Sequence, residues 1–191
     1  MKKIATLVLA LAATVASTSA FAGTTVFTGD TTNGPTYNRP VSGTPPTVLS
    51  GVGTAVRYVV TPFTVSVSGN YNFLNSAPTY DSYLGVHRNL FDPTNGLLNA
   101  LSYDDDAGPG SDSQITGLAL LAGVSYFAVS SGFANTDFGA FTLTIDGPGN
   151  IIGAGGGGVP EPATWAMMIF GFAGIGAALR RRRATGLAVT A

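Results

Sequence analysis

Apolar and polar residues alternate along the middle of this chain. Residues 63–68 read Phe-Thr-Val-Ser-Val-Ser and residues 141–146 read Phe-Thr-Leu-Thr-Ile-Asp. A strict period of two is typical of half-buried β-strands. Further short runs rich in β-branched and aromatic residues, bounded by Gly, Pro, Asn or Asp, predict strands at 24–28, 56–60, 71–74, 83–86, 115–121 and 124–129. No convincing helical period interrupts them, so the pattern predicts an all-β fold, a single antiparallel β-sandwich or jelly roll.

The two ends of the chain break the alternation with continuous apolar runs. Near the N-terminus, Lys2 and Lys3 precede an apolar stretch over residues 4–15. The small residues Ala20 and Ala22 then stand ahead of Gly23. This order is typical of a secretory signal peptide, and we expect cleavage between Ala22 and Gly23.

The C-terminal apolar run covers residues 163–179 and carries no charge. As a helix it would be about 25 Å long at about 1.5 Å per residue, close to the hydrocarbon thickness of a bilayer. Trp165 suits the outer interface, and Arg180, Arg181, Arg182 and Arg183 would stay on the cytoplasmic side. The segment therefore predicts a transmembrane helix.

A short motif precedes this predicted helix. Pro160-Glu161-Pro162, then Trp165-Ala166-Met167-Met168, Gly171-Phe172 and Arg180 to Arg183 occur in this order. The combination resembles a PEP-CTERM sorting signal, although Ala173 stands where glycine is usual and residues 184–191 trail beyond the arginines. The resemblance implies a substrate of exosortase, a membrane-embedded cysteine transpeptidase expected to cut at or near Pro160 to Pro162. The alternative is a plain C-terminal membrane anchor.

These features divide the chain. The expected order is a signal peptide (1–22), a β-sandwich (23–146), a glycine-rich linker (147–159), a sorting signal (160–183) that includes the helix 163–179, and a short tail (184–191).

The body carries a second, looser resemblance. Its motifs are Asp81-Ser82-Tyr83-Leu84, Phe91-Asp92-Pro93, Asp105-Asp106 with a following glycine, residues 120–126 and residues 139–143. In this order they are similar to bacterial pre-peptidase C-terminal β-sandwich domains, over roughly Phe63 to Gly147. That resemblance implies a binding or auxiliary role rather than catalysis.

Removing the two ends changes the charge of the chain. Residues 23–159 hold three arginines and nine aspartates with no Lys or Glu, a net charge of −6. Nucleic-acid binding needs clustered Lys and Arg, so we expect no nucleic-acid partner. The chain has no cysteine, so its stability outside the cytoplasm must come from packing, or from packing and metal.

The densest charge lies in residues 104–113, Asp-Asp-Asp-Ala-Gly-Pro-Gly-Ser-Asp-Ser. Ca²⁺ takes six to eight oxygen ligands, which an acidic glycine-rich loop can supply. The EF-hand template fails at Gly108, Pro109 and Ile115. A calcium loop of another kind remains a candidate, and an acidic solvated turn is the alternative. The candidate ligands are Asp81, Asp104, Asp105, Asp106 and Asp112.

The sequence offers no catalytic constellation. His87 is the single histidine, and we expect it at the exposed end of a strand. A G-x-S-x-G elbow, an H-E-x-x-H helix and a cysteine nucleophile are all missing from the sequence. The residues Tyr71, Tyr80, Tyr83, Tyr103 and Tyr126 could stack on sugar rings or pack in the core. We therefore assign no catalytic residue and expect a non-enzyme.

Three functions follow in order of preference. The first is an exported, exosortase-processed surface or matrix protein with a structural or adhesive role linked to exopolysaccharide and biofilm. The second is a calcium-assisted carbohydrate- or protein-binding module, and the third a secreted hydrolase. The expected partners are the Sec export machinery, exosortase, the inner membrane and exopolysaccharide. The expected location is the periplasmic face of the inner membrane before processing, and the cell surface or medium afterwards.

Overall fold

The computed structural model describes residues 22–153, which form ten β-strands and no helix. The strands are β1 (Gly23–Asp30), β2 (Thr36–Tyr37), β3 (Val56–Val65), β4 (Gly69–Ser76), β5 (Ser82–Arg88), β6 (Ala100–Asp104), β7 (Ser113–Leu120), β8 (Tyr126–Gly132), β9 (Ala140–Gly147) and β10 (Ile151–Gly153). The expected all-β class is confirmed for this part of the chain.

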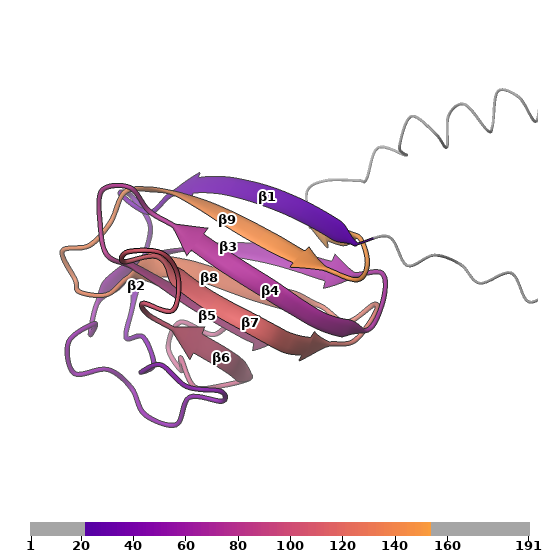
Figure 1. Ribbon diagram of the computed structural model, residues 1–191. Helices are drawn as coiled ribbons and strands as arrows, with labels where there is room; N and C mark the ends of the chain where they lie inside the picture. Colours follow the sequence, from indigo (N-terminus) through magenta and orange to yellow (C-terminus); the bar gives the residue numbers. More distant parts are fainter. Residues whose placement is uncertain (1–21, 154–191) are drawn as a thin grey trace, which may run out of the picture.

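The strands form two antiparallel sheets that pack face to face (Figure 1). One sheet has the order β1-β9-β4-β7, and the other has the order β10-β3-β8-β5-β6 with β2 paired to β3. The pairs β1·β9, β3·β8, β4·β7 and β5·β6 are nested along the chain. This nesting amounts to one long antiparallel hairpin wound across both sheets, which is the jelly-roll form of the predicted sandwich.

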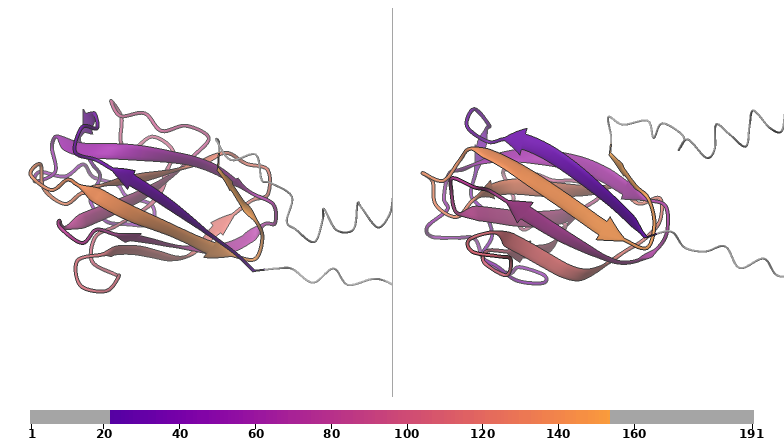
Figure 2. Two further views of the ribbon diagram at one scale, coloured as in Figure 1. Left: turned by 90° about the horizontal axis from the view of Figure 1, so that it is seen from above. Right: turned by 45° about the horizontal axis from the view of Figure 1, so that its top comes forward.

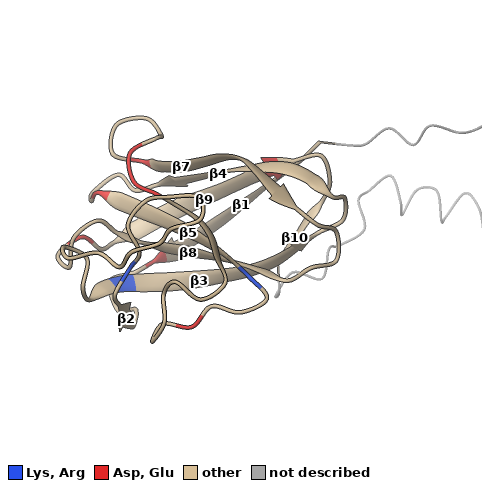
Figure 3. Ribbon diagram, turned by 90° about the horizontal axis from the view of Figure 1, so that it is seen from below, with Lys and Arg blue, Asp and Glu red and all other residues tan. Residues whose placement is uncertain are grey.

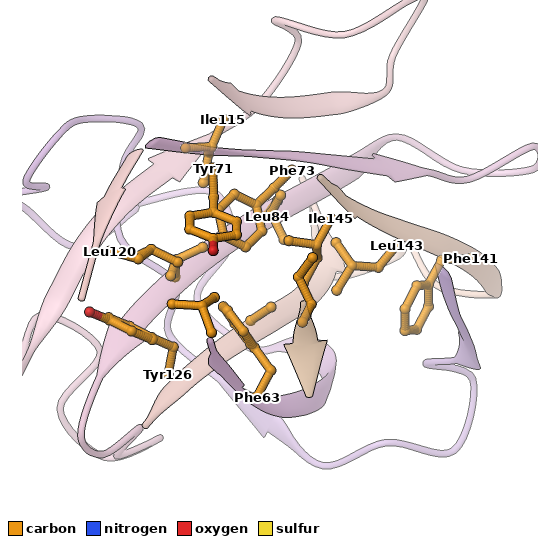
Figure 4. Packing of buried hydrophobic residues seen from close by; sticks show 14 of the residues in the cluster. Phe63, Tyr71, Phe73, Leu84, Ile115, Leu120, Tyr126, Phe141, Leu143 and Ile145 are labelled. Atoms are coloured by element: carbon orange, nitrogen blue, oxygen red, sulfur yellow. The ribbon is translucent and has the colours of Figure 1, made fainter. Parts of the chain in front are cut away.

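The main core lies between the sheets (Figure 4). The alternation predicted for residues 141–146 is confirmed, because Phe141, Leu143 and Ile145 are buried while the residues between them are not. The opposing sheet contributes Phe63 and Leu84 among others, and the Phe63 ring stacks on Tyr126 with ring centroids 5.7 Å apart. Alternate residues of each strand are buried between the two sheets, so the strands are fixed in place and the loops that connect them lie at the two ends of the sandwich.

A second apolar cluster covers the outer face of the β3–β8 sheet. Tyr37, Tyr58 and Phe91 contact one another edge to face, with ring centroids 5.0–5.4 Å apart. Tyr37 comes from the short strand β2, and Phe91 comes from the long loop between β5 and β6, which lies over this sheet. Strand β5 is consequently buried on both faces up to His87, which its sequence pattern does not indicate.

Four segments differ from the sequence prediction. Strand β3 runs unbroken through Pro62, where β8 is its one partner, because β2 and β10 pair with β3 only at 56–57 and 63–65. Strands β2 and β6 were not predicted. Strand β10 lies inside the segment predicted as linker, so the sandwich continues past Asp146 to Gly153.

The antiparallel register gives the sandwich two distinct ends. The loops 66–68, 121–123 and 148–150 meet at the end where β1 begins, and we call this the tail end. Figure 2 shows from two further sides that the start of β1 and the strand β10 lie toward this end. The starts of β3, β5 and β7 lie at the opposite end.

Candidate functional site

Most of the charge of the sandwich lies at the end opposite the tail end, which we call the acidic end. It is defined by Asp30, Asp81, Asp104, Asp105, Asp106, Asp112 and Asp137. Figure 3 shows most of the acidic segments (red) gathered toward that end. Only Asp92 and Asp146 of the nine aspartates lie elsewhere.

Three of these carboxylates come together. Asp81 directly precedes β5, while Asp105 and Asp106 directly follow β6, and the two strands are antiparallel neighbours. Their ends therefore meet, and one carboxylate oxygen from each residue lies within 4.8 Å of the others. The Oδ1 atoms of Asp81 and Asp105 are buried and have no hydrogen-bond partner. Carboxylate oxygens are the kind of ligand atom that Ca²⁺ prefers, and these two are free of hydrogen bonds within the described part of the chain.

Burial and mutual repulsion disfavour the ionised form of the carboxyl groups in this cluster. Burial, followed by the charges of Asp106 and Asp81, raises the pKa of Asp105 to about 6. Burial, followed by the charges of Asp106 and Asp137, also raises the pKa of Asp81. Both shifts oppose ionisation, so a bound divalent cation would relieve repulsion that the chain itself leaves in place.

Arg39 is a positive charge that influences the pKa values of the cluster, but its guanidinium makes its direct contacts with other groups. Its side chain is 2 % exposed, and its guanidinium lies over the Tyr83 ring at 3.7 Å and the Phe133 ring at 4.7 Å from the centroids. Its Nε donates to the Phe133 carbonyl at 2.9 Å and its Nη1 to the Pro40 carbonyl at 3.1 Å. Arg39 lowers the pKa values of Asp81 and Asp105 through space, but this effect is smaller than that of burial.

The two other predicted ligands, Asp104 and Asp112, accept hydrogen bonds from backbone amides. The Oδ2 of Asp104 accepts hydrogen bonds from the amides of Ala107 at 3.1 Å and Gln114 at 2.8 Å. The Oδ1 of Asp112 accepts from the Ala77 amide at 3.1 Å. The structure thus brings three of the five predicted residues together and gives these two oxygens a role in shaping the loop.

The prediction for His87 was wrong, because this side chain is fully buried. Its Nδ1 lies 2.9 Å from the Leu98 carbonyl and its Nε2 lies 2.7 Å from the Tyr103 hydroxyl. A carbonyl can only accept, so Nδ1 carries the proton and Nε2 accepts from Tyr103. Burial lowers the pKa of His87. Both ring nitrogens are therefore occupied by structural partners.

The tyrosines considered for sugar stacking are core residues. Four of them, Tyr71, Tyr83, Tyr103 and Tyr126, are at most 2 % exposed, and Tyr80 is partly buried. The outer loops that bury Tyr83 and Tyr103 could not be placed from sequence. An aromatic stacking surface built from these rings is therefore excluded.

The predicted sorting residues and the predicted membrane helix lie outside the described part of the chain, and so does Ala20 of the predicted cleavage site, whereas Ala22 and Gly23 are described. Ala22 is exposed and Gly23 begins β1. Among the described residues, no helix reaches the length and apolarity that crossing a membrane requires.

Comparison with known proteins bears on this C-terminal region. A search of curated proteins finds no match to the chain. The resemblance of the body to pre-peptidase C-terminal domains stays a prediction. A comparison with protein families finds the PEP-CTERM protein-sorting motif over residues 158–183, a range that contains Pro160, Glu161, Pro162, Trp165 and Arg180 to Arg183. The chain thus carries the C-terminal signal of an exported protein targeted to exosortase.

Proposed function

We propose that this chain is a non-catalytic surface or extracellular-matrix protein, which exosortase processes and which has a structural or adhesive role linked to exopolysaccharide and biofilm. The sorting motif at residues 158–183 is the observation that carries the proposal. It begins a few residues after the last strand, β10, so cutting near Pro160 to Pro162 would release the whole folded body. The signal peptide over residues 1–22 and the helix over 163–179 supply export by the Sec machinery and the inner-membrane hold before cutting.

Two features of the sandwich support a role without catalysis. His87 uses both ring nitrogens in hydrogen bonds to Leu98 and Tyr103, so it is not available as a general base. The body has a net charge of −6 and no lysine, which suits a solvated module among acidic polymers when divalent cations are present.

The test is the intact mass of the protein recovered from its own host, with and without exosortase. We expect a species that begins at Gly23 and ends near Glu161 only in cells that hold the enzyme. Added mass on that species would identify the acceptor. A species that keeps Arg180 to Arg183 in both strains would instead show a plain membrane anchor.

A second function is favoured by the cluster of Asp81, Asp105 and Asp106. We propose that these residues hold a Ca²⁺ ion in a calcium-assisted carbohydrate- or protein-binding module. Three carboxylates leave several of the six to eight calcium ligand positions to water, backbone carbonyls or a bound partner. The two orphaned buried oxygens support this assignment.

Thermal unfolding of the processed protein tests it. At a calcium concentration 100-fold above the dissociation constant, the stabilisation should be about 2.7 kcal/mol. Asp105→Asn should abolish the shift in Tm. Asp30→Asn, at the same end but outside the cluster, is the matched control and should keep it. A Tm that calcium leaves unchanged, or that magnesium raises equally, would remove this candidate.

A further inference from the structure

The tail end of the sandwich is a closed, ordered surface. Backbone amides of Asn150 and Ala122 donate to the hydroxyls of Ser66 at 2.8 Å and Ser68 at 2.9 Å. The Leu121 amide donates to the Tyr126 hydroxyl at 2.8 Å. These bonds join all three loops of the tail end, so it is presented as one rigid unit.

The three loops that form this end carry no charge and expose aliphatic side chains, and the charged residues Asp146 and Arg88 lie in the adjoining strands, opposite Thr24 and Tyr126. Residues 66–68, 121–123 and 148–150 include no Asp, Glu, Lys, Arg or His. Val67 is 39 % exposed and Leu121 is 50 % exposed. Their loops are neighbours, since the Gly123 amide donates to the Val65 carbonyl at 3.0 Å. The acidic end, by contrast, would be repelled by anionic lipids.

The length of chain beyond the sandwich selects an orientation. From Gly153 to Ala163, where the predicted membrane helix begins, the backbone spans at most about 35 Å. Gly153 pairs with Phe63 near the tail end. If the acidic end rested on the bilayer, Gly153 would be lifted by at least the rise of β3 from Val56 to Phe63, about 23 Å at about 3.3 Å per residue. The connecting chain would then have to span about two thirds of its maximum length, with a loss of conformational entropy.

From these three observations, we propose that the tail end rests on the lipid surface in the membrane-held precursor, through Val67 and Leu121, and that the acidic end faces outward. This rests on the proposed function in one respect, because it takes residues 163–179 to lie in the bilayer. The short connection keeps the tail end at an effective concentration of about millimolar or more near the lipid, which lowers the entropic cost of docking these two aliphatic side chains. The cluster of Asp81, Asp105 and Asp106 would then be open to partners before any processing.

Site-directed fluorescence of the full-length precursor tests the orientation. The chain has no cysteine, so Val67→Cys, Leu121→Cys and, as the control at the acidic end, Ser111→Cys each give one labelling site. All three positions are exposed, and the label is nitrobenzoxadiazole. The variants are reconstituted into phosphatidylethanolamine–phosphatidylglycerol vesicles with and without a lipid-borne spin-label quencher. We expect several-fold stronger quenching at 67 and 121 than at 111.

Equal quenching at the three sites, or stronger quenching at 111, would overturn the orientation. A signal at 67 and 121 that changes with protein density but not with the lipid quencher would show that a second copy covers the tail end, which also overturns it. Flotation of the same vesicles separates the two levels of the argument. A precursor that does not float contradicts the membrane-held state of the proposed function, whereas one that floats without quenching contradicts the docking alone.

A second variant checks that the aliphatic contacts are responsible. Val67→Asp with Leu121→Asp, labelled through Ala122→Cys, should lose most of the quenching while the protein still floats. Unchanged quenching would show that tethering alone holds the tail end near the lipid and would overturn the docking contact.

Discussion

The two ends of the sandwich are closed by different chemistry. At the tail end, serine and tyrosine hydroxyls pair with the backbone, as in the bond from the Leu121 amide to Tyr126. At the acidic end, carboxylates do part of this work, as when Asp104 accepts from two amides, and other carboxylate oxygens are left buried without partners. The two sheets therefore end in two different surfaces. At the tail end the hydroxyl groups are hydrogen-bonded, whereas at the acidic end the carboxylates outnumber the positive charges.

The comparison separates what the fold requires from what it tolerates. The inner faces of the strands fix the fold through period-two burial, and each end must only satisfy its backbone groups. The tail end does so with neutral hydroxyls. The acidic end has more carboxylates than its backbone groups require as hydrogen-bond acceptors. Because these extra carboxylates repel one another, this end is the better place to look for a bound ligand.

The largest expected effect is at the tail end. Tyr126 is buried against Phe63 and also accepts from the Leu121 amide. Tyr126→Ala should lower the free energy of unfolding by about 3–5 kcal/mol, because a large ring leaves a cavity. Tyr126→Phe, the matched variant, should cost about 1–2 kcal/mol for the lost hydrogen bond alone. Urea unfolding measures both, and equal losses would mean that the hydroxyl, not the ring, closes this end.

At the acidic end, the carboxylates should divide into two kinds. Asp104→Ala leaves the Gln114 amide without its partner and should cost about 1–3 kcal/mol in the free energy of unfolding. Asp106→Ala removes an exposed member of the cluster and should change it by about 0.5 kcal/mol or less. Comparable losses in urea unfolding would show that the loop depends on total charge rather than on individual hydrogen bonds.

The sandwich should lose stability in acid through His87. Burial holds the folded-state pKa of His87 below its ordinary value of 6.5. Below about pH 6.5 the unfolded chain binds a proton that the folded chain excludes, so the free energy of unfolding falls as pH decreases. His87→Gln should be less stable at pH 8 but should lose less on acidification. A parallel decline for both proteins would assign the acid sensitivity to another group.

The acidic end should respond to pH in the opposite direction, with the smallest effect. The folded-state pKa of Asp105 is about 6, above its ordinary value of 3.8. The unfolded chain ionises first, so Asp105 reduces stability as pH rises from about 4 to 6. Without calcium, Asp105→Asn should therefore stabilise the protein at pH 8, by about 1 kcal/mol or less because solvent screens a partly exposed carboxyl. At pH 4 the gain should vanish, and a gain of equal size at both pH values would refute this assignment.

The sequence was informative where one local pattern decides the structure. The alternation in residues 141–146 predicted which side chains of β9 are buried, because neighbouring residues of a strand face opposite sides of the sheet. The sorting motif was equally local and was confirmed by the family comparison.

The remaining features depend on contacts between distant segments. His87 was misplaced because Arg39 and Phe91, which come from two loops, cover the outer face of β5. Nothing in residues 82–88 signals that cover. The meeting of Asp81 with Asp105 follows from the pairing of β5 with β6, and β6 was not predicted. The sequence could therefore name five candidate ligands, but it could not predict which three of them lie together in one site.

The pairing of β1 with β9 has a consequence for the timing of folding. The first strand to emerge during synthesis and export finds its partner only after more than 100 further residues, since Asp30 at the end of β1 pairs with Ala140 at the start of β9. Such non-local pairing makes folding slow, on the order of milliseconds to seconds. The sandwich can therefore close only when its last strands have arrived.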